Sequence, residues 1–146
     1  MVSIESSNKK ATSADIEDFE QRYNLKLAED YKKFLLDFNG GYANPNVFEI
    51  SKEQGESALN TLYGLGIDDE YDELTSVYES LDGIIPSGFI SIADDSGGNQ
   101  ICLGVDDDYF GKIFVWIHDM EIEEDMDNMF LLADDFKLFS DNLYAE

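Results

Sequence analysis

Residues 93–104 read ADDSGGNQICLG and place an aspartate and a serine beside paired glycines, a combination that proteases use. Asp95-Ser96-Gly97 matches half of an aspartic-protease site, in which two carboxylates share one proton. The chain contains a single Asp-Ser-Gly, so this chemistry would require a homodimer. The tripeptide alone therefore does not indicate an aspartic protease.

Asp-Ser-Gly-Gly also surrounds the nucleophile of many serine proteases. That mechanism needs a histidine base that is held by an orienting acid. The only histidine, His118, ends a different predicted strand, and 146 residues are too few for two barrels. We therefore expect a glycine-rich hairpin turn at this position, without catalytic residues.

The sequence contains few residues in a pattern that binds a metal ion or a cofactor. The stretch DDDYFG matches positions one, three and six of a calcium loop through Asp106, Asp108 and Gly111, but position twelve is Ile117, where a bidentate glutamate is needed. Weak Ca²⁺ binding at these aspartates stays open. The only cysteine, Cys102, excludes an internal disulfide and a thiolate zinc cluster, and its place in an apolar strand predicts a buried thiol. We expect no metal site and no cofactor.

Charge is the most unusual property of the sequence. Nine Lys and Arg against 33 Asp and Glu give a net charge of −24. Residues 1–33 hold six basic and seven acidic residues, whereas residues 34–146 hold three and 26. Such a field repels nucleic acids and anionic membranes, and it attracts a basic protein at low salt. We expect a basic protein partner; the alternative is that the acids serve solubility or adaptation to salt.

Length and hydropathy limit the class of protein to which the chain can belong. No segment approaches the ~20 apolar residues of a transmembrane helix, and the N-terminal residues lack the apolar run of a signal peptide. A chain of 146 residues that is 43% hydrophobic is sufficient for one core. We expect a cytoplasmic monomer with an N-terminal extension at residues 1–11 and a single domain at residues 12–146.

Hydrophobic spacing predicts the elements that must position these side chains. The predicted helices cover residues 14–23, 29–38 and 71–82 and a closing segment marked by Phe136, Phe139 and Leu143; the predicted strands cover residues 46–50, 61–66, 89–93, 99–105 and 112–117. The last strand is apolar on both faces, which places it inside a sheet or under a helix. The pattern predicts one α+β domain: a central antiparallel meander sheet with N-terminal helices, a middle helix and a C-terminal helix.

Hairpin alternation predicts which loops share an end of the sheet. Strands 89–93 and 112–117 run in one direction, and strand 99–105 runs back between them. The 94–98 turn and the acidic run after His118 therefore lie at one end. Asp106 to Asp108 lie at the other end, about 23 Å away at ~3.3 Å per residue.

We expect the partner to bind at the first of these two ends, which carries the larger group of acids. The predicted partner-binding residues are Asp94, Asp95, Trp116, His118, Asp119, Glu121, Glu123, Glu124, Asp125 and Asp127. The alternative is an interface on the sheet surface that bears Trp116, with the acids acting only at a distance.

The order of these landmarks resembles the SUKH superfamily, the Smi/Knr-type domain of bacterial immunity proteins and fungal cell-wall-synthesis regulators. EDYKKFLLDFNGGYANPNVFEI matches the family's second helix and its Asn-Gly-Gly, and IIPSGFISIADDSGGNQICLGV matches its central strands and turn. GKIFVWIHD matches its Gly-Lys, aromatic strand and histidine. The resemblance covers about residues 12–144. Leu27-Ala28 departs from the Leu-Pro that usually precedes the second helix.

The resemblance implies an immunity protein that is not an enzyme and that neutralises a polymorphic toxin encoded beside it, often a nuclease. It also implies that the Asp-Ser-Gly-Gly stretch is a turn of the family fold. A basic nuclease surface would complement the acidic residues of this chain. The alternative is an intracellular regulatory or scaffold module for protein interactions, like the fungal relatives.

Overall fold

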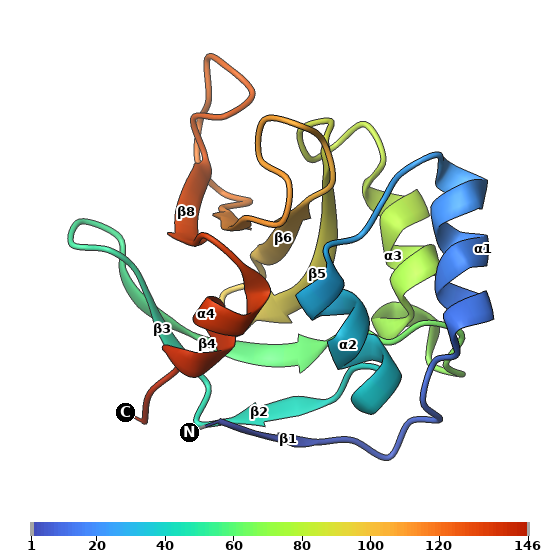
Figure 1. Ribbon diagram of the computed structural model, residues 1–146. Helices are drawn as coiled ribbons and strands as arrows, with labels where there is room; N and C mark the ends of the chain where they lie inside the picture. Colours follow the sequence, from blue (N-terminus) through green and yellow to red (C-terminus); the bar gives the residue numbers. More distant parts are fainter. Residues whose placement is uncertain (1, 146) are drawn as a thin grey trace.

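Within residues 2–145, which the computed structural model describes, six strands form one antiparallel sheet (Figure 1). Their spatial order follows the chain: β3 Val47–Ser51, β4 Gly55–Leu62, β5 Phe89–Asp95, β6 Gln100–Gly104, β7 Ile113–Trp116 and β8 Met129–Ala133. Every neighbouring pair is antiparallel. The predicted meander sheet is confirmed.

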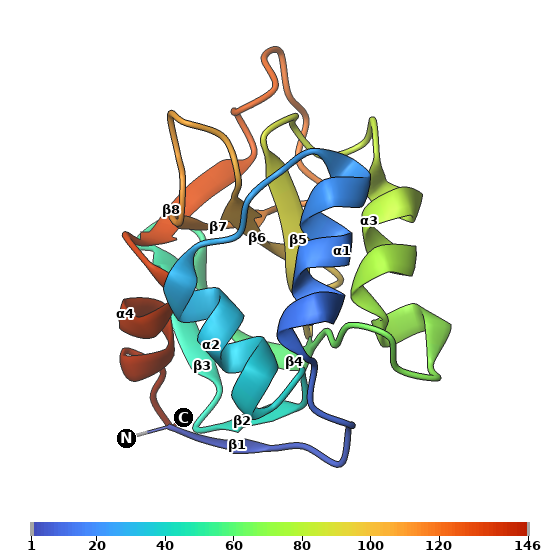
Figure 2. The same ribbon diagram turned by 45° about the vertical axis from the view of Figure 1, so that its right-hand side comes forward.

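The same residues contain four α-helices and one short 3-10 turn: α1 Ser13–Tyr23, α2 Glu29–Asp37, η1 Glu70–Asp72, α3 Leu74–Leu81 and α4 Phe136–Asp141. Figures 1 and 2 show α1, α2 and α4 in front of one face of the sheet, with α3 beside α1. We call this the inner face and the opposite one the outer face. The predicted α+β arrangement of helices is confirmed.

Side-chain alternation along β5, β6 and β7 builds the main core on the inner face. The sheet residues of this core have no exposed surface: Ile90, Ile92, Ile101, Leu103, Ile113 and Val115. Phe19 of α1, Leu35 of α2 and Phe136 of α4 pack against them. β7 lies between β6 and β8 and also buries Phe114 on the outer face, which confirms the expectation for strand 112–117.

Local signals set where the first two helices begin and end. The Thr12 hydroxyl accepts a hydrogen bond from the Asp15 N–H, and the Asp15 carboxylate accepts the Thr12 N–H, which caps α1. After α2 the chain turns at Asn39, whose φ is 53°. The buried Asn39 amide donates to the carbonyl oxygens of Lys9 and Leu65 and accepts the Leu65 N–H. The Asn-Gly-Gly stretch is therefore a structural junction, as its sequence indicates.

Four strands differ from the sequence-based expectation. The strand predicted at residues 61–66 spans Gly55–Leu62, because its first half is a polar hairpin arm paired with β3. β8 is missed because its five residues follow directly on an acidic segment. β1 Ser3–Glu5 pairs with β2 Tyr42–Asn44, and such short, exposed strands carry no periodic signal. β1 lies inside the predicted extension, whose boundary at residue 11 stays a prediction.

The two edges of the sheet approach each other, so the sheet is nearly closed. Val47 of β3 and Tyr144, which follows α4, exchange two backbone hydrogen bonds of 3.0 Å. These bonds cover part of an edge that would otherwise offer free N–H and C=O groups to another strand.

Candidate functional site

The turn between β5 and β6 is built around Asp95. Asp95 is only 3% exposed. Its carboxylate accepts hydrogen bonds from the N–H groups of Gly97 and Asn99, the Asn99 side-chain amide and the Ser57 hydroxyl. Gly98 follows with a φ of 82°, which glycine adopts without strain. The four donors occupy the carboxylate, so Asp95 shapes the turn.

His118 fastens this turn to the end of β7. Its Nε2–H donates to the Gly97 carbonyl oxygen at 2.9 Å, and its backbone N–H donates to the Asn99 side-chain oxygen at 3.1 Å. Asp94, on the other side of the turn, accepts the Thr61 N–H at 3.0 Å. The prediction that the turn and His118 share one end of the sheet is confirmed. That Asp94, Asp95 or His118 contacts a partner stays a prediction.

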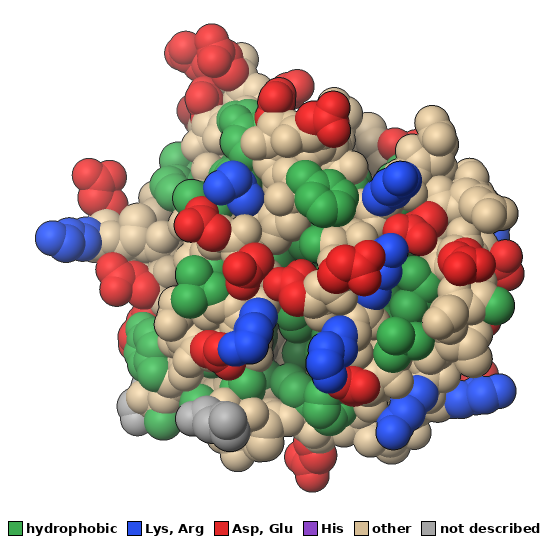
Figure 3. Space-filling view, viewed as in Figure 1, with side chains coloured by type: hydrophobic (Ala, Val, Ile, Leu, Met, Phe, Trp, Pro, Cys, Tyr) green, Lys and Arg blue, Asp and Glu red, His purple; other side chains and the backbone are tan. Residues whose placement is uncertain are grey.

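Residues 119–128, which we call the acidic loop, leave the sheet at this end and return as β8. Figure 3 shows acidic side chains gathered on this loop at the top of the view. The N–H groups of Glu124 and Glu123 donate to the Asp127 carboxylate at 3.0 Å, and these bonds lower the pKa of Asp127. Asp127 therefore organises the loop that carries the other acids.

The other acids of the loop are exposed. They are Asp119, Glu121, Glu123, Glu124 and Asp125. No ion pair within residues 2–145 involves any of them. Their charges are therefore available to a partner.

The basic side chains lie elsewhere. In the described part of the chain the ion pairs join Arg22 to Glu79, Lys32 to Glu20 and Glu29, Lys33 to Asp37, Lys112 to Asp134 and Lys137 to Asp141. Figure 3 shows basic and acidic side chains interspersed over the helices. Residues 53–111 and 113–136 contain no Lys or Arg. The acidic loop thus has no basic residue in its own part of the sequence.

A cleft of about 370 Å³ opens between the acidic loop and residues 81–89, and we call it the outer cleft. Trp116 of β7 and Phe89 of β5 line it, together with Ile122 and Asp125 of the acidic loop and Asp82 from the opposite wall. From the sequence, the acidic loop and the sheet surface that bears Trp116 are alternative predictions for the partner interface. In the structure the two adjoin the same cleft, so one partner surface can engage both.

Packing on the outer face holds Trp116 in place. Phe89, Cys102, Phe114 and Met129 form a small buried cluster, and Trp116 packs against it. The rings of Phe89 and Phe114 meet edge to face with centroids 5.2 Å apart. Burial raises the pKa of the Cys102 thiol, which makes it an unreactive core residue, as its strand position predicts. The floor of the outer cleft is therefore supported by close packing.

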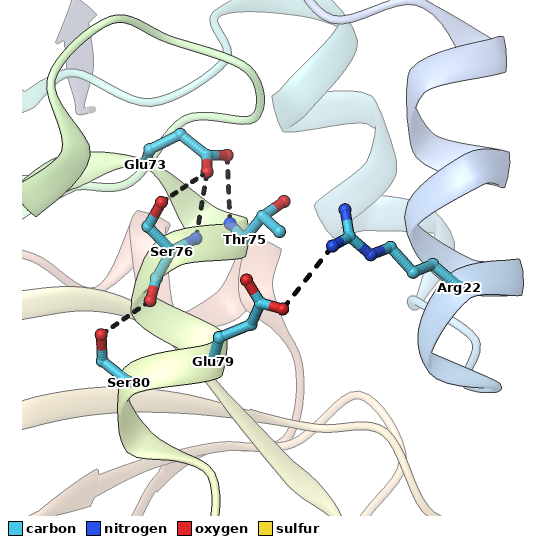
Figure 4. Close-up of polar contacts among 6 residues, drawn as sticks. All are labelled: Arg22, Glu73, Thr75, Ser76, Glu79 and Ser80. Carbon is cyan, nitrogen blue, oxygen red and sulfur yellow. Dashed lines mark hydrogen bonds and ion pairs between the residues drawn. The ribbon is translucent and has the colours of Figure 1, made fainter.

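Glu73 fixes the position of the opposite wall, because it caps the helix that leads into it. Its carboxylate accepts the N–H groups of Thr75 and Ser76 in the first turn of α3 (Figure 4) and also the N–H of Gly66. Burial raises the pKa of this group, but the backbone donors at Gly66, Thr75 and Ser76 outweigh burial and hold the pKa below its usual value. The cap therefore depends on the ionised carboxylate.

Two other pockets in the described part of the chain are larger, at about 440 Å³ beside α1 and about 480 Å³ beside β1 and β2. No group of three or more His, Cys, Asp or Glu side chains there is arranged to hold a metal ion. Asp106 uses a carboxylate oxygen to accept the Asp107 N–H. No helix among these residues is both long and apolar enough to cross a membrane. The outer cleft combines an aromatic floor with an aspartate on each wall, and it is the candidate binding site.

The opposite wall is the part of the site that sequence reasoning misses. Tyr78, Asp82 and Ile84 line the cleft from α3 and from the loop that follows it. None of the predicted partner-binding residues lies in this loop. A signal is present in it, because two consecutive isoleucines stand in a Gly-, Pro- and Ser-rich stretch and the first, Ile84, is 58% exposed. Exposed apolar groups of this kind gather at interaction surfaces.

Comparisons with known proteins place the chain in a family. A family model described as SMI1 / KNR4 family (SUKH-1) matches residues 10–142. The SPbeta prophage-derived uncharacterized protein YokK of Bacillus subtilis (strain 168) is 28% identical over 152 residues, which cover 92% of this chain and 76% of that protein. The uncharacterized protein YobM of the same organism is 34% identical over 86 residues, 58% of this chain and 43% of that protein. The family match spans the six-stranded sheet and both walls of the outer cleft, and the chain belongs to the SMI1/KNR4 family (SUKH-1).

Proposed function

We propose that this chain is an immunity protein that binds a toxin with a basic surface and neutralises it in the cytosol, without catalysing a reaction itself. The SUKH-1 family is typical of toxin immunity proteins, and one similar protein is prophage-derived. The observation that carries the proposal is the set of unpaired, exposed acids beside the outer cleft. Their charge complements a surface that is built to bind phosphates.

The proposed toxin is a nuclease domain. Nuclease surfaces are basic because they bind a phosphate backbone, and an acidic partner that covers such a surface blocks access to nucleic acid. Opposite potentials also accelerate encounter, which matters for a protein that must capture a toxin before it acts. The acidic loop together with the outer cleft offers both charge and apolar contact area, as stable interfaces require.

Protection of cells tests this proposal most directly. A candidate toxin domain is expressed in bacterial cells alone and together with the chain, and growth is followed. We expect growth to recover only with co-expression, and the purified chain to inhibit cleavage of nucleic acid at a one-to-one ratio. Binding without inhibition or protection would instead favour a regulatory or scaffold module.

The dependence of association on salt tests the role of charge. The Debye length shrinks from ~30 Å at 0.01 M salt to ~10 Å at 0.1 M. We expect stopped-flow association rates with the toxin domain to fall by tens-fold over this range, because electrostatic steering raises on-rates by roughly 10–10³. A flat profile would show that the acids serve solubility only.

A further inference from the structure

The outer cleft combines three kinds of surface. Trp116 and Phe89 provide an aromatic floor. Ile84 and Ile122, which are 58% and 46% exposed, stand on opposite walls. Each wall also carries one aspartate that lines the cleft. The ligand must therefore satisfy aromatic, aliphatic and anionic groups at once.

The two aspartates lack a cation of their own. Among the ion pairs formed within residues 2–145, none includes Asp82 or Asp125. Among the described residues, no Lys or Arg lines the cleft. The charge of Asp82 also acts inside the cleft: burial raises the pKa of the Tyr78 hydroxyl, and the Asp82 carboxylate raises it further. The cleft thus has a negative potential against an aromatic surface.

We propose that the outer cleft receives one arginine side chain of the partner. Its aliphatic stem lies between Ile84 and Ile122, and its guanidinium group lies over Trp116 and between Asp82 and Asp125. This proposal rests on the proposed function and identifies the chemistry of the partner at that site. It adds a specific anchor to the long-range attraction of the acidic loop.

Arginine fits this set of groups better than other occupants do. Its planar guanidinium stacks on aromatic rings and donates two parallel hydrogen bonds to a carboxylate, whereas a lysine ammonium is a strongly hydrated point charge. A purely apolar segment would bury Asp82 and Asp125 without partners, at a high desolvation cost. A volume of about 370 Å³ lies at the lower end of the ~300–1,000 Å³ of ligand pockets, which suits a single long side chain.

The chain contains a reporter for this site, because Trp116 is its only tryptophan. Its fluorescence is recorded during titration with three capped tripeptides at constant ionic strength: Gly-Arg-Gly, Gly-Lys-Gly and Gly-citrulline-Gly. Citrulline has the shape of arginine without its charge. We expect a saturable change with the arginine peptide in the millimolar range, several-fold weaker binding of the lysine peptide, and at least tenfold weaker binding of the citrulline peptide.

Variants separate the cleft from general electrostatics. The double variant Asp82→Asn with Asp125→Asn should weaken binding of the arginine peptide at least tenfold. The double variant Asp107→Asn with Asp108→Asn removes the same charge from two side chains that do not line the cleft and should bind normally. All four side chains are exposed, so both variants should fold, which circular dichroism checks. Equal losses in the two variants, or equal binding of the arginine and citrulline peptides, would overturn the proposal.

The peptide experiment and the toxin experiment fail independently. If the chain protects cells but arginine gives no saturable signal, or lysine binds as well as arginine does, the anchor is wrong and the immunity function stands. If arginine binds in the cleft as described but no protection occurs, the anchor is supported and the immunity function is not.

Discussion

The two faces of this molecule use their charges in opposite ways. On the inner face, Lys33 pairs with Asp37 at 2.9 Å, and Lys137 pairs with Asp141 at 2.7 Å. At the end of the sheet beside the outer cleft, the acids of residues 119–125 have no basic neighbour in their part of the sequence. Basic residues are available to the fold, but none of those in the described residues lines the outer cleft.

This difference separates charges that serve the fold from charges that are left for a partner. Exposed ion pairs of the first kind each stabilise a protein by about 0–1 kcal/mol. Unpaired like charges of the second kind repel one another and lower stability by comparable amounts. Their presence beside an aromatic cleft is explained if the compensating charge arrives with the partner.

The largest expected effect is the difference in stability between substituting Asp95 and substituting Asp125, two acids at the same end of the sheet. Asp95→Ala leaves four donors without their acceptor, so we expect the free energy of unfolding to fall by about 3 kcal/mol and the Tm by about 10 °C. Asp125→Ala should change the free energy by less than about 0.5 kcal/mol, because Asp125 is exposed and outside any ion pair within residues 2–145. Urea unfolding measures both. Equal losses would contradict the distinction between the two acids.

The next effect compares the two ends of the sheet. Changing Glu121, Glu123 and Glu124 to lysine should slow association with the toxin domain about 30-fold, or roughly 2 kcal/mol. The same change at the three aspartates of residues 106–108 alters net charge equally and should slow association only a few-fold. Stopped-flow kinetics at 0.05 M salt compares the two variants. Equal, small losses, combined with a large loss for Trp116→Ala, would assign the contact to the cleft alone.

A smaller effect concerns the wall of the cleft and depends on pH. Glu73→Gln should lower the free energy of unfolding by about 1 kcal/mol at pH 7, because it removes the ionised cap of α3. The pKa of Glu73 is depressed in the folded protein, so its contribution is complete above the unfolded pKa of about 4.3 and is lost as pH falls through the folded pKa.

Urea unfolding of the wild type and of Glu73→Gln at pH 7, 5 and 3 tests this sign. The difference between the two proteins should narrow as pH decreases. Glu70→Gln in η1 is the control, since Glu70 is exposed, and it should differ little from the wild type at any pH. A constant difference down to pH 3 would mean that charge on Glu73 is unimportant.

The smallest effect concerns the inner face. Lys33→Gln breaks an exposed pair whose side chains are 76% and 47% exposed, and we expect the free energy of unfolding to change by less than about 0.5 kcal/mol at 0.1 M salt. Glu123→Gln combined with Glu124→Gln should raise stability by a few tenths of a kcal/mol, because it relieves repulsion. Thermal unfolding of both variants measures the sign. A loss of stability in the second variant would contradict the description of the acidic loop as unpaired.

Much of the fold is predictable because its main elements carry periodic signals. The spacing of Tyr31, Phe34 and Leu35 predicts α2, and the alternation of Ile101 and Leu103 predicts β6. β1 and β2 are too short for such signals and form by pairing with each other across 36 residues of chain or more. β8 is missed because it follows directly on the acidic loop, and it forms by pairing with β7. The bounds of β4 are wrong in the prediction because half of this strand is a polar hairpin arm.

The site is less predictable, because the burial of a side chain and the position of the two cleft walls depend on the three-dimensional fold. Hairpin alternation correctly places the 94–98 turn beside His118. It does not reveal that Asp95 is buried, since an aspartate in a glycine-rich turn has the same sequence signal whether it faces solvent or its own backbone. Asp82 and Ile84 reach the cleft only because α3 ends beside the outer face.

The order of strands in the sheet also predicts the sequence in which the protein opens. Neighbours within β5 to β7 are joined by short turns, whereas β1–β2 pairing and the Val47–Tyr144 bridge close long stretches of chain. Contacts between distant segments require the closure of long loops, which costs conformational entropy. Such contacts therefore form late in folding. In native-state hydrogen exchange, amides of β1 and Tyr144 should exchange first, at free energies well below global unfolding, and those of β6 and β7 should exchange last. The domain would then loosen at its two chain ends while the floor of the outer cleft stays folded.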